Sequence, residues 1–353
     1  MIVSSNNEKS IKKLGEDIVI KGINNVNTSD DTFVDNKIRP NSFDEIIGRS
    51  NEKKTLMMMI DSAKSRGEAL DHILFYGPPG LGKTTFAMAI SSQLGSNLRV
   101  TSGPAIERPG DLAAILTNLK SSDVLFIDEI HRLSKSVEEI LYPAMEDRVL
   151  DIVMGKGASA KTVRLNLEQF TLVGATTQIG KISSPMRDRF GLIQRLDYFE
   201  VEDLDNILNR ASNIWNISLD KASLREISNR SRGTARIALR LLKRVRDYVY
   251  SIGKDNIDIL SVKAALDLLG VDEDGLEGID RKLLAMIYEN YDGGPVGLST
   301  LSAAISEDIS TLEDVYEPYL MKKGYIKRTH RGRVLTKQGE DKALEIIDKL
   351  SIK

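Results

Sequence analysis

The stretch that most constrains what this chain can fold into is Gly77-Pro78-Pro79-Gly80-Leu81-Gly82-Lys83-Thr84. An apolar run at residues 73–76 precedes it and apolar residues with helical spacing follow it, so the pattern predicts a strand, a loop and a helix. Glycines let backbone N–H groups surround phosphate oxygens, and the N-terminus of the helix adds a positive dipole. We expect Lys83 to reach the β- and γ-phosphates of a nucleotide and the hydroxyl of Thr84 to bind Mg²⁺.

A second buried-looking strand ends in two acids. Residues 124–127 are all apolar and lead into Asp128 and Glu129, a pattern typical of a central parallel strand. Open α/β sheets bind ligands at the carboxyl ends of their strands. Asp128 is then placed to hold Mg²⁺ through water, and Glu129 to activate an attacking water as general base.

Residues 170–177 form another apolar strand pattern, which ends in Thr176 and Thr177. These hydroxyls would lie beside the γ-phosphate if this strand neighbours the one that ends at Asp128. Farther on, Arg187 and Arg189 bracket an acid. They form either a local ion-pair lattice or an arginine finger that reaches the phosphates of a neighbouring subunit, a role worth about 10³–10⁵ in rate.

Apolar residues alternate with others on both sides of a glycine-containing loop at 155–162, which predicts a hairpin over about 150–167. Its apolar side chains either meet a partner protein or pack on their own domain, and the pattern does not separate the two.

The chain of 353 residues suits two or three domains. The Asn-rich residues 1–36 are expected to be a disordered tail. Residues 37–200 are expected to form an α/β domain on a parallel sheet that includes the hairpin, and residues 201–271 a purely helical domain. Residues 272–353 show three helices followed by a hairpin, the outline of a winged helix.

Two further positions bear on a nucleotide. Ile38-Arg39-Pro40 either packs against an adenine base or serves only as a strap at the start of the folded domain. Arg236 follows a Gly-Thr helix start in the helical region, and it either faces phosphate or is one more solvated charge.

The net charge of −2 gives no sign of a nucleic-acid partner, but the charge is unevenly distributed. Residues 321–337 contain seven of the 49 Lys and Arg residues and none of the 51 acids. This segment covers the wing hairpin, where Arg328, Arg331 and Arg333 are candidates for contact with the DNA backbone.

Composition excludes several classes of site. Without cysteine there is no disulfide and no thiolate metal site, and the three histidines lie in different contexts that indicate no metal cluster. No apolar run approaches the ~18 residues of a membrane span, and the start of the chain lacks the pattern of a secretion signal. We expect a cytoplasmic protein with no membrane partner.

Taken together and in this order, these stretches resemble the RuvB family of AAA+ motors from about residue 38 to about residue 339. The resemblance is densest around the phosphate loop, at 70–72, 101–104, 110–114, 123–133, 141–147, 174–177, 187–191, 293–298 and 331–333. It implies an AAA+ ATPase domain, a helical lid domain and a C-terminal winged-helix domain. It also implies an ATP-dependent DNA translocase that drives Holliday junction branch migration in recombination and repair, working as a homohexamer ring with a RuvA-like junction-binding protein and a RuvC-like resolvase.

The resemblance assigns roles position by position. Lys83 and Thr84 match Walker A, Asp128 and Glu129 match Walker B, and Thr177, Arg189 and Arg236 match sensor 1, the arginine finger and sensor 2. The positions that match nucleotide contacts, with ATP and Mg²⁺ as cofactors, are Ile38, Arg39, Gly77, Pro78, Pro79, Gly80, Leu81, Gly82, Lys83, Thr84, Thr85, Glu146, Asp147, Arg148, Arg189, Phe199 and Arg236.

On the wing, Arg328 and Arg333 match DNA contacts and Arg331 lies between them, while Val163 and Leu165 match the hairpin that engages the RuvA-like partner. Two positions depart from the family. Ala235 replaces the usual proline before sensor 2, and Phe199 stands where tyrosine is frequent.

Three functions are consistent with these features. The first is a hexameric ATP-driven DNA translocase, the second a nucleotide-switched assembly factor that binds DNA without moving along it, and the third a scaffold that uses ATP only to oligomerise. Glu129 and Arg189 argue against the scaffold, which needs neither a general base nor an arginine finger.

Overall fold

A computed structural model of the chain describes residues 38–154, 161–254 and 256–351. The predicted tail at 1–36 and the tip of the hairpin at 155–160 lie outside these ranges. The chain divides into two compact units, Met1–Asp197 and Tyr198–Lys353. Within the described ranges, no helix is long and apolar enough to cross a lipid bilayer.

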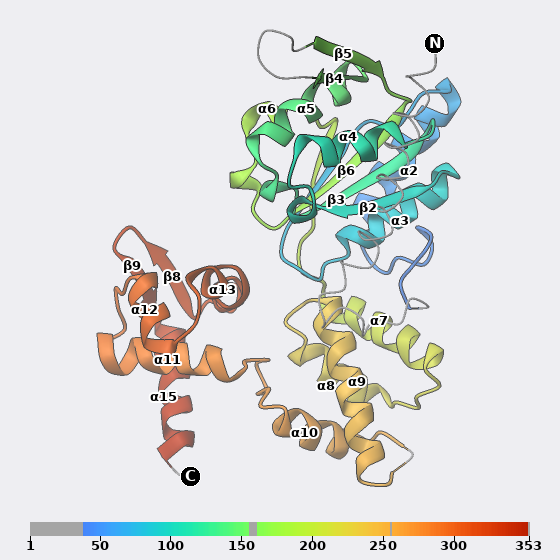
Figure 1. The fold of residues 1–353 in the computed structure, drawn as a ribbon. Coiled ribbons are helices and arrows are strands. Elements are labelled where there is room, and N and C mark those ends of the chain that lie inside the picture. The colour runs from blue at the N-terminus through green and yellow to red at the C-terminus, as the bar shows by residue number, and fades with distance from the viewer. Residues whose placement is uncertain (1–37, 155–160, 255, 352–353) are drawn as a thin grey trace. The chain divides into compact units, whose positions relative to one another are not determined.

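The first unit is organised around a five-stranded parallel sheet (Figure 1). Its strands are β1 (Ile73–Tyr76), β2 (Leu98–Ser102), β3 (Asp123–Asp128), β6 (Phe170–Thr176) and β7 (Leu192–Arg195), in the order β2-β3-β6-β1-β7. In the middle, Val173 of β6 is in register with Ile73 on one side and Phe126 on the other. Because all five strands are parallel, their carboxyl ends share one edge of the sheet.

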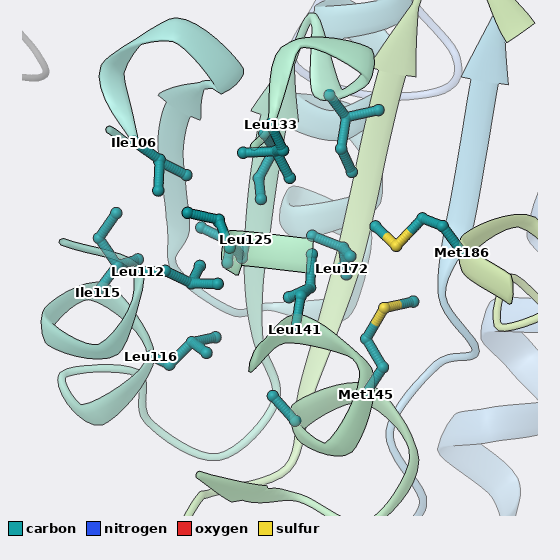
Figure 2. Packing of buried hydrophobic residues seen from close by; sticks show 14 of the residues in the cluster. Ile106, Leu112, Ile115, Leu116, Leu125, Leu133, Leu141, Met145, Leu172 and Met186 are labelled. Atoms are coloured by element: carbon teal, nitrogen blue, oxygen red, sulfur yellow. The ribbon is translucent and has the colours of Figure 1, made fainter. Parts of the chain in front are cut away.

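Helices cover both faces of this sheet. On one face lie α2 (Ser50–Arg66) and α3 (Lys83–Leu94), where Phe86 of α3 stacks on Phe75 of β1 with ring centroids 5.3 Å apart. On the other face lie α4 (Pro109–Thr117) and α5 (Lys135–Glu146). Figure 2 shows their side chains meeting the sheet. Leu112 and Leu141 are fully buried there, together with the strand residues Leu125 and Leu172.

The predicted hairpin is present between α5 and β6 as β4 (Val149–Met154) and β5 (Lys161–Asn166). The two strands are antiparallel, with Leu150 opposite Leu165 and Asp151 opposite Arg164. The second pair makes a two-pronged ion pair, Nε to Oδ1 and Nη2 to Oδ2, each at 2.8 Å. Leu150 is fully buried, so the base of the hairpin is anchored in the core of its own unit.

The second unit begins with four helices, α7 (Val201–Ile214), α8 (Lys221–Arg230), α9 (Ala235–Ser251) and α10 (Ile259–Leu268). A winged helix follows. It consists of α11 (Gly278–Tyr291), α12 (Leu298–Ile305), α13 (Ile309–Thr311), a π-helical turn (Leu312–Tyr316), α14 (Glu317–Lys322), strands β8 (Ile326–Thr329) and β9 (Gly332–Leu335), and α15 (Lys337–Ser351).

Three of these elements are absent from the sequence predictions, for physical reasons. Helix α5 contains Pro143, which usually ends a helix. Strand β7 is only four residues long and lies at the edge of the sheet, so it lacks the apolar run of a central strand. Gly339, near the start of α15, is a poor helix former and therefore hides this helix from sequence prediction. The structure shows why glycine is needed there: a Cβ at this position would lie 1.9 Å from the carbonyl oxygen of Tyr325.

The packing predicts the effect of truncating Leu141, which joins α5 to the core. Leu141→Ala is expected to lower the free energy of unfolding of the first unit by about 2–5 kcal/mol, because a buried cavity replaces the side chain. Met58→Ala in α2 is the control, since Met58 is 63% exposed. Urea titrations followed by circular dichroism would measure both, and equal losses for the two variants would contradict this account of the core.

Candidate active site

The loop after β1 follows a path that only glycine permits at its first residue. Gly77 has a φ of 141°, and a Cβ there would lie 2.3 Å from the carbonyl oxygen of Leu196. Its N–H donates to the carbonyl of Thr176 at 3.2 Å, which ties the loop to the end of β6. Gly80 and Gly82 also have positive φ values, 77° and 92°. The chain then enters α3 at Lys83, so the loop opens at a helix N-terminus as predicted.

Lys83 is buried, with 8% of its surface exposed. Its ammonium donates to the carbonyls of Gly77 and Pro78, each at 2.8 Å. A buried charge needs such partners to offset desolvation. These bonds hold the positive charge against the first two residues of the loop.

The strand order brings the other predicted groups to the same edge of the sheet. Asp128 ends β3, and Thr176 ends β6 in register with Tyr76, the last residue of β1. Since β6 is hydrogen-bonded to both β3 and β1, the acid and the start of the phosphate loop flank the same strand. The Oδ1 of Asp128 accepts a hydrogen bond from the N–H of Glu129 at 2.9 Å.

Glu129 has a left-handed backbone with a φ of 47°, a conformation that costs a non-glycine residue roughly 1–3 kcal/mol. Its carboxylate pairs with Arg132 at 3.0 Å, and both side chains are exposed. At the end of β2, a Cβ on Gly103 would lie 2.4 Å from the carbonyl oxygen of Glu129. Strain held by close packing at this turn is the kind found at functional sites.

The two threonines after β6 are in different environments. Thr176 is buried, and its hydroxyl is hydrogen-bonded to Nδ1 of His131 at 2.9 Å and accepts from the N–H of Gln178. Thr177 is exposed at the same edge. Sequence reasoning did not single out His131, whose only signal is its position three residues after Asp128.

Arg189 and Glu146, far apart in the sequence, lie together. Nη2 of Arg189 is 3.1 Å from Oε2 of Glu146, and Nη1 donates to the carbonyl of Pro185 at 2.6 Å. The guanidinium also lies 4.5 Å from the centre of the Tyr142 ring. None of these partners belongs to the phosphate loop. Asp147 and Arg148 are exposed next to Glu146.

The remaining nucleotide candidates are spread over both units. In the first unit, Ile38 is buried and Arg39 is half-buried. In the second, the N–H of Phe199 donates to the carbonyl of Gly233 at 2.8 Å. Arg236 is exposed in the first turn of α9, whose N-cap Thr234 accepts a hydrogen bond from Ile237.

Val163 and Leu165 of the hairpin differ in exposure. Val163 is 38% exposed, whereas Leu165 packs partly against the core of its own unit. The exposure of Val163 therefore favours contact with a partner protein, whereas the packing of Leu165 favours contact within its own domain.

The wing differs from its predicted outline in one respect. The sequence suggests a connection over 329–333, but β9 already begins at Gly332, and the turn consists of His330 and the exposed Arg331. Gly332 has a φ of 136°, and a Cβ there would lie 2.3 Å from the carbonyl oxygen of Val296. This close approach lets the strand start earlier, which places Arg333 inside β9 opposite Arg328.

The sheet order, the glycine loop and the acid pair define a P-loop ATPase. Family models match nearly all of the described chain: the Holliday junction DNA helicase RuvB P-loop domain at residues 38–196, the RuvB AAA lid domain at 199–272 and the RuvB C-terminal winged helix domain at 273–343. The chain belongs to the RuvB family of ATP-dependent, helicase-type motors. The resemblance inferred from the sequence and the expected fold class are thereby confirmed.

Individual relatives in sequence and structure belong to the same family. The chain is 56% identical over 309 residues to the Holliday junction branch migration complex subunit RuvB of Clostridium kluyveri, covering 88% of each chain. It is 53% identical over 320 residues to the subunit of the same name from Fusobacterium nucleatum, covering 91% of this chain and 95% of the relative. The structure of the Thermotoga maritima RuvB branch migration motor matches with a TM-score of 0.78 and 48% identity, over 86% of this chain and 97% of that one.

The loop geometry predicts the effect of a single methyl group. Gly77→Ala is expected to weaken ATP binding by about tenfold or more, because the added Cβ must displace the loop or the backbone at Leu196, and ~1.4 kcal/mol already corresponds to tenfold. Gly67→Ala is the control: Gly67 also has a positive φ, of 67°, but a Cβ there meets nothing within 4 Å. Titration with a fluorescent ATP analogue measures both, and wild-type affinity for Gly77→Ala would refute the argument.

Proposed function

We propose that this protein is the ATP-driven motor that moves the branch point of a Holliday junction, acting as a DNA translocase. The observation that carries the proposal is the combination, in one chain, of a phosphate loop beside an acid pair and a winged helix with paired arginines. A scaffold needs no strained Glu129, and an ATPase that acts on small substrates needs no basic wing. The match of all three domains to one motor family supports the same conclusion.

For hydrolysis, Lys83 would hold the β- and γ-phosphates, and the loop N–H groups would hold the remaining phosphate oxygens. Thr84 and Asp128 offer oxygen ligands to Mg²⁺, which when bound neutralises phosphate charge. Glu129 would take the proton of the attacking water, and exposed Thr177 would orient that water.

Arg189 is proposed to complete the active site of a neighbouring subunit in a homohexamer ring. Its partners are Glu146, Pro185 and Tyr142, at a distance in sequence from the loop, and Glu146, Asp147 and Arg148 are exposed beside it. A half-exposed carboxylate holds an arginine weakly, so the guanidinium can exchange Glu146 for a γ-phosphate. Arg236 and Phe199 are proposed to contact the nucleotide from the lid, together with Ile38 and Arg39.

The relatives named above are subunits of a Holliday junction branch migration complex. For this chain we propose junction DNA as the substrate of the wing, through Arg328, Arg331 and Arg333. A RuvA-like junction-binding protein is proposed to engage the hairpin through Val163 and Leu165, of which Val163 is exposed. A RuvC-like resolvase is proposed from the family resemblance, and a cytoplasmic location is proposed from the sequence patterns described above.

Two properties of ATP turnover test the proposal. Duplex DNA is expected to stimulate hydrolysis by the wild type, and Glu129→Gln is expected to lower the rate by about 10²–10⁴ while ATP still binds. Adding Arg189→Ala subunits to wild type should lower the rate more than dilution does, because each altered subunit disables its neighbour's site. Phosphate release and displacement of a strand from a synthetic four-way junction are the measurements.

Arg195→Ala is the control for the mixing experiment, since Arg195 is an exposed arginine of the same unit that pairs with nearby Asp197. In mixtures, the ATP hydrolysis rate should then equal the sum of the rates of the Arg195→Ala and wild-type subunits. Turnover that ignores DNA and tolerates Arg189→Ala subunits would leave the nucleotide-switched assembly factor as the better reading.

A further inference from the structure

Two of the wing arginines face each other across the hairpin. Arg328 of β8 and Arg333 of β9 are direct register partners in the antiparallel pair. Like charges at directly opposed positions destabilise a β-hairpin, because the side chains lie within about 5 Å at their Cβ atoms. A hairpin that carries this pair needs a compensating group.

That group is Glu317, the first residue of α14. Its side chain is 2% exposed and takes both guanidiniums on one carboxylate. Nε and Nη2 of Arg328 donate to Oε1 and Oε2 at 2.7 and 2.9 Å, and the same atoms of Arg333 donate to the same oxygens at 3.0 Å each. Two parallel bonds from each arginine fix its plane as well as its position.

The charges support this arrangement. Burial opposes ionisation of Glu317, but the hydrogen bonds from Arg328 and Arg333 outweigh it and lower the pKa of the carboxyl below its ordinary value. One buried carboxylate therefore lies between two arginines, and these three side chains together carry one net positive charge, which Glu313 at the rim offsets. Glu313 lies at its exposed rim, 3.2 Å from Nη2 of Arg328 and 3.9 Å from Nη2 of Arg333.

The paired hydrogen bonds from each arginine to Glu317 leave other N–H groups of the two guanidiniums available for a ligand. Each guanidinium uses Nε and Nη2 on Glu317, and in the described part of the chain Nη1 of neither arginine has a hydrogen-bond partner. Arg328 remains 45% exposed and Arg333 16% exposed. Two arginines held side by side with spare N–H groups suit a phosphate oxygen of a DNA backbone.

We propose that Glu317 is a positioning residue for DNA binding, which holds Arg328 and Arg333 in a fixed pair that clamps one backbone phosphate. The proposal rests on the proposed DNA contact of the wing and adds a residue to it that does not itself touch DNA. The π-helical turn at Leu312–Tyr316 immediately precedes Glu317 and sets where the carboxylate enters the cluster. Such turns are rare and frequently occur at functional sites.

A positioning role for Glu317 and simple electrostatics predict opposite effects on DNA affinity when the charge of Glu317 is removed. Removing a negative charge near DNA raises the net positive charge of the wing, so electrostatics alone predicts tighter binding. Positioning predicts weaker binding, because two opposed arginines without their carboxylate repel each other and lose their shared plane.

The test compares binding of the full chain to a labelled DNA duplex across a salt titration. Glu317→Gln is expected to weaken binding about tenfold and to reduce the salt slope by roughly 1, the loss of one phosphate contact. Glu313→Gln is the matched control, since it removes the same charge from the same cluster at its exposed rim, and it should bind as tightly as wild type or more tightly. Binding by Glu317→Gln that equals or exceeds wild type would overturn the proposal.

Two further variants keep the outcome decisive. Glu317→Asp retains the charge but is one methylene too short for both forks, so it should weaken binding as well; if thermal unfolding shows that Glu317→Gln does not fold, Glu317→Asp alone decides. The double variant Arg328→Ala/Arg333→Ala tests the underlying contact. If the double variant binds DNA as tightly as the wild type, the wing contact and the role of Glu317 both fail. If the double variant binds DNA more weakly but Glu317→Asp binds it as tightly as the wild type, only the positioning role is overturned.

Discussion

The hydrogen bonds of β6 to both of its neighbours are the interaction on which the site depends. Val173 is in register with Ile73 of β1 and Phe126 of β3, so the chain segments that lead to the phosphate loop and to the acid pair are held on either side of one strand. The carbonyl of Thr176 extends the pairing to the N–H of Gly77, the first residue of the loop. Three segments that lie about fifty residues apart in sequence, β1, β3 and β6, thereby end at one edge, where their backbone dipoles and side chains face a common ligand.

Close approach at this edge depends on residues without a side chain. The carbonyl oxygen of Leu196 occupies the space of a Cβ at Gly77, and that of Glu129 occupies it at Gly103. Both contacts draw a turn inward, and the second accompanies the left-handed backbone of Glu129. Strain of this kind persists only where the surroundings are over-determined, and the fully buried core below the sheet provides that support.

Three of the arginines with proposed roles, Arg189, Arg328 and Arg333, are held by carboxylates of the same chain, in two different ways. Glu146, which pairs with Arg189, is 54% exposed, and such a pair is weak and easily exchanged. Glu317, which pairs with Arg328 and Arg333, is buried and makes four hydrogen bonds. A group that must reach a neighbouring active site benefits from a weak partner, whereas a pair of groups that must clamp one backbone phosphate benefits from a strong one.

Short-range chemistry decided much of this protein from sequence alone. The glycine loop with Lys83 and Thr84, the apolar strand that ends at Asp128, and the helical lid and winged helix all follow from spacing and residue type, because turns, strands and amphipathic helices are local. The sequence also showed an unopposed basic wing, and there the structure differs: Glu317 and Glu313, outside the basic segment, pair with two of its arginines. Likewise only the fold joined Arg189 to Glu146 and Thr176 to His131. These contacts form between residues distant in sequence, and no local pattern encodes which charges and hydroxyls the packing of strands and helices will bring together.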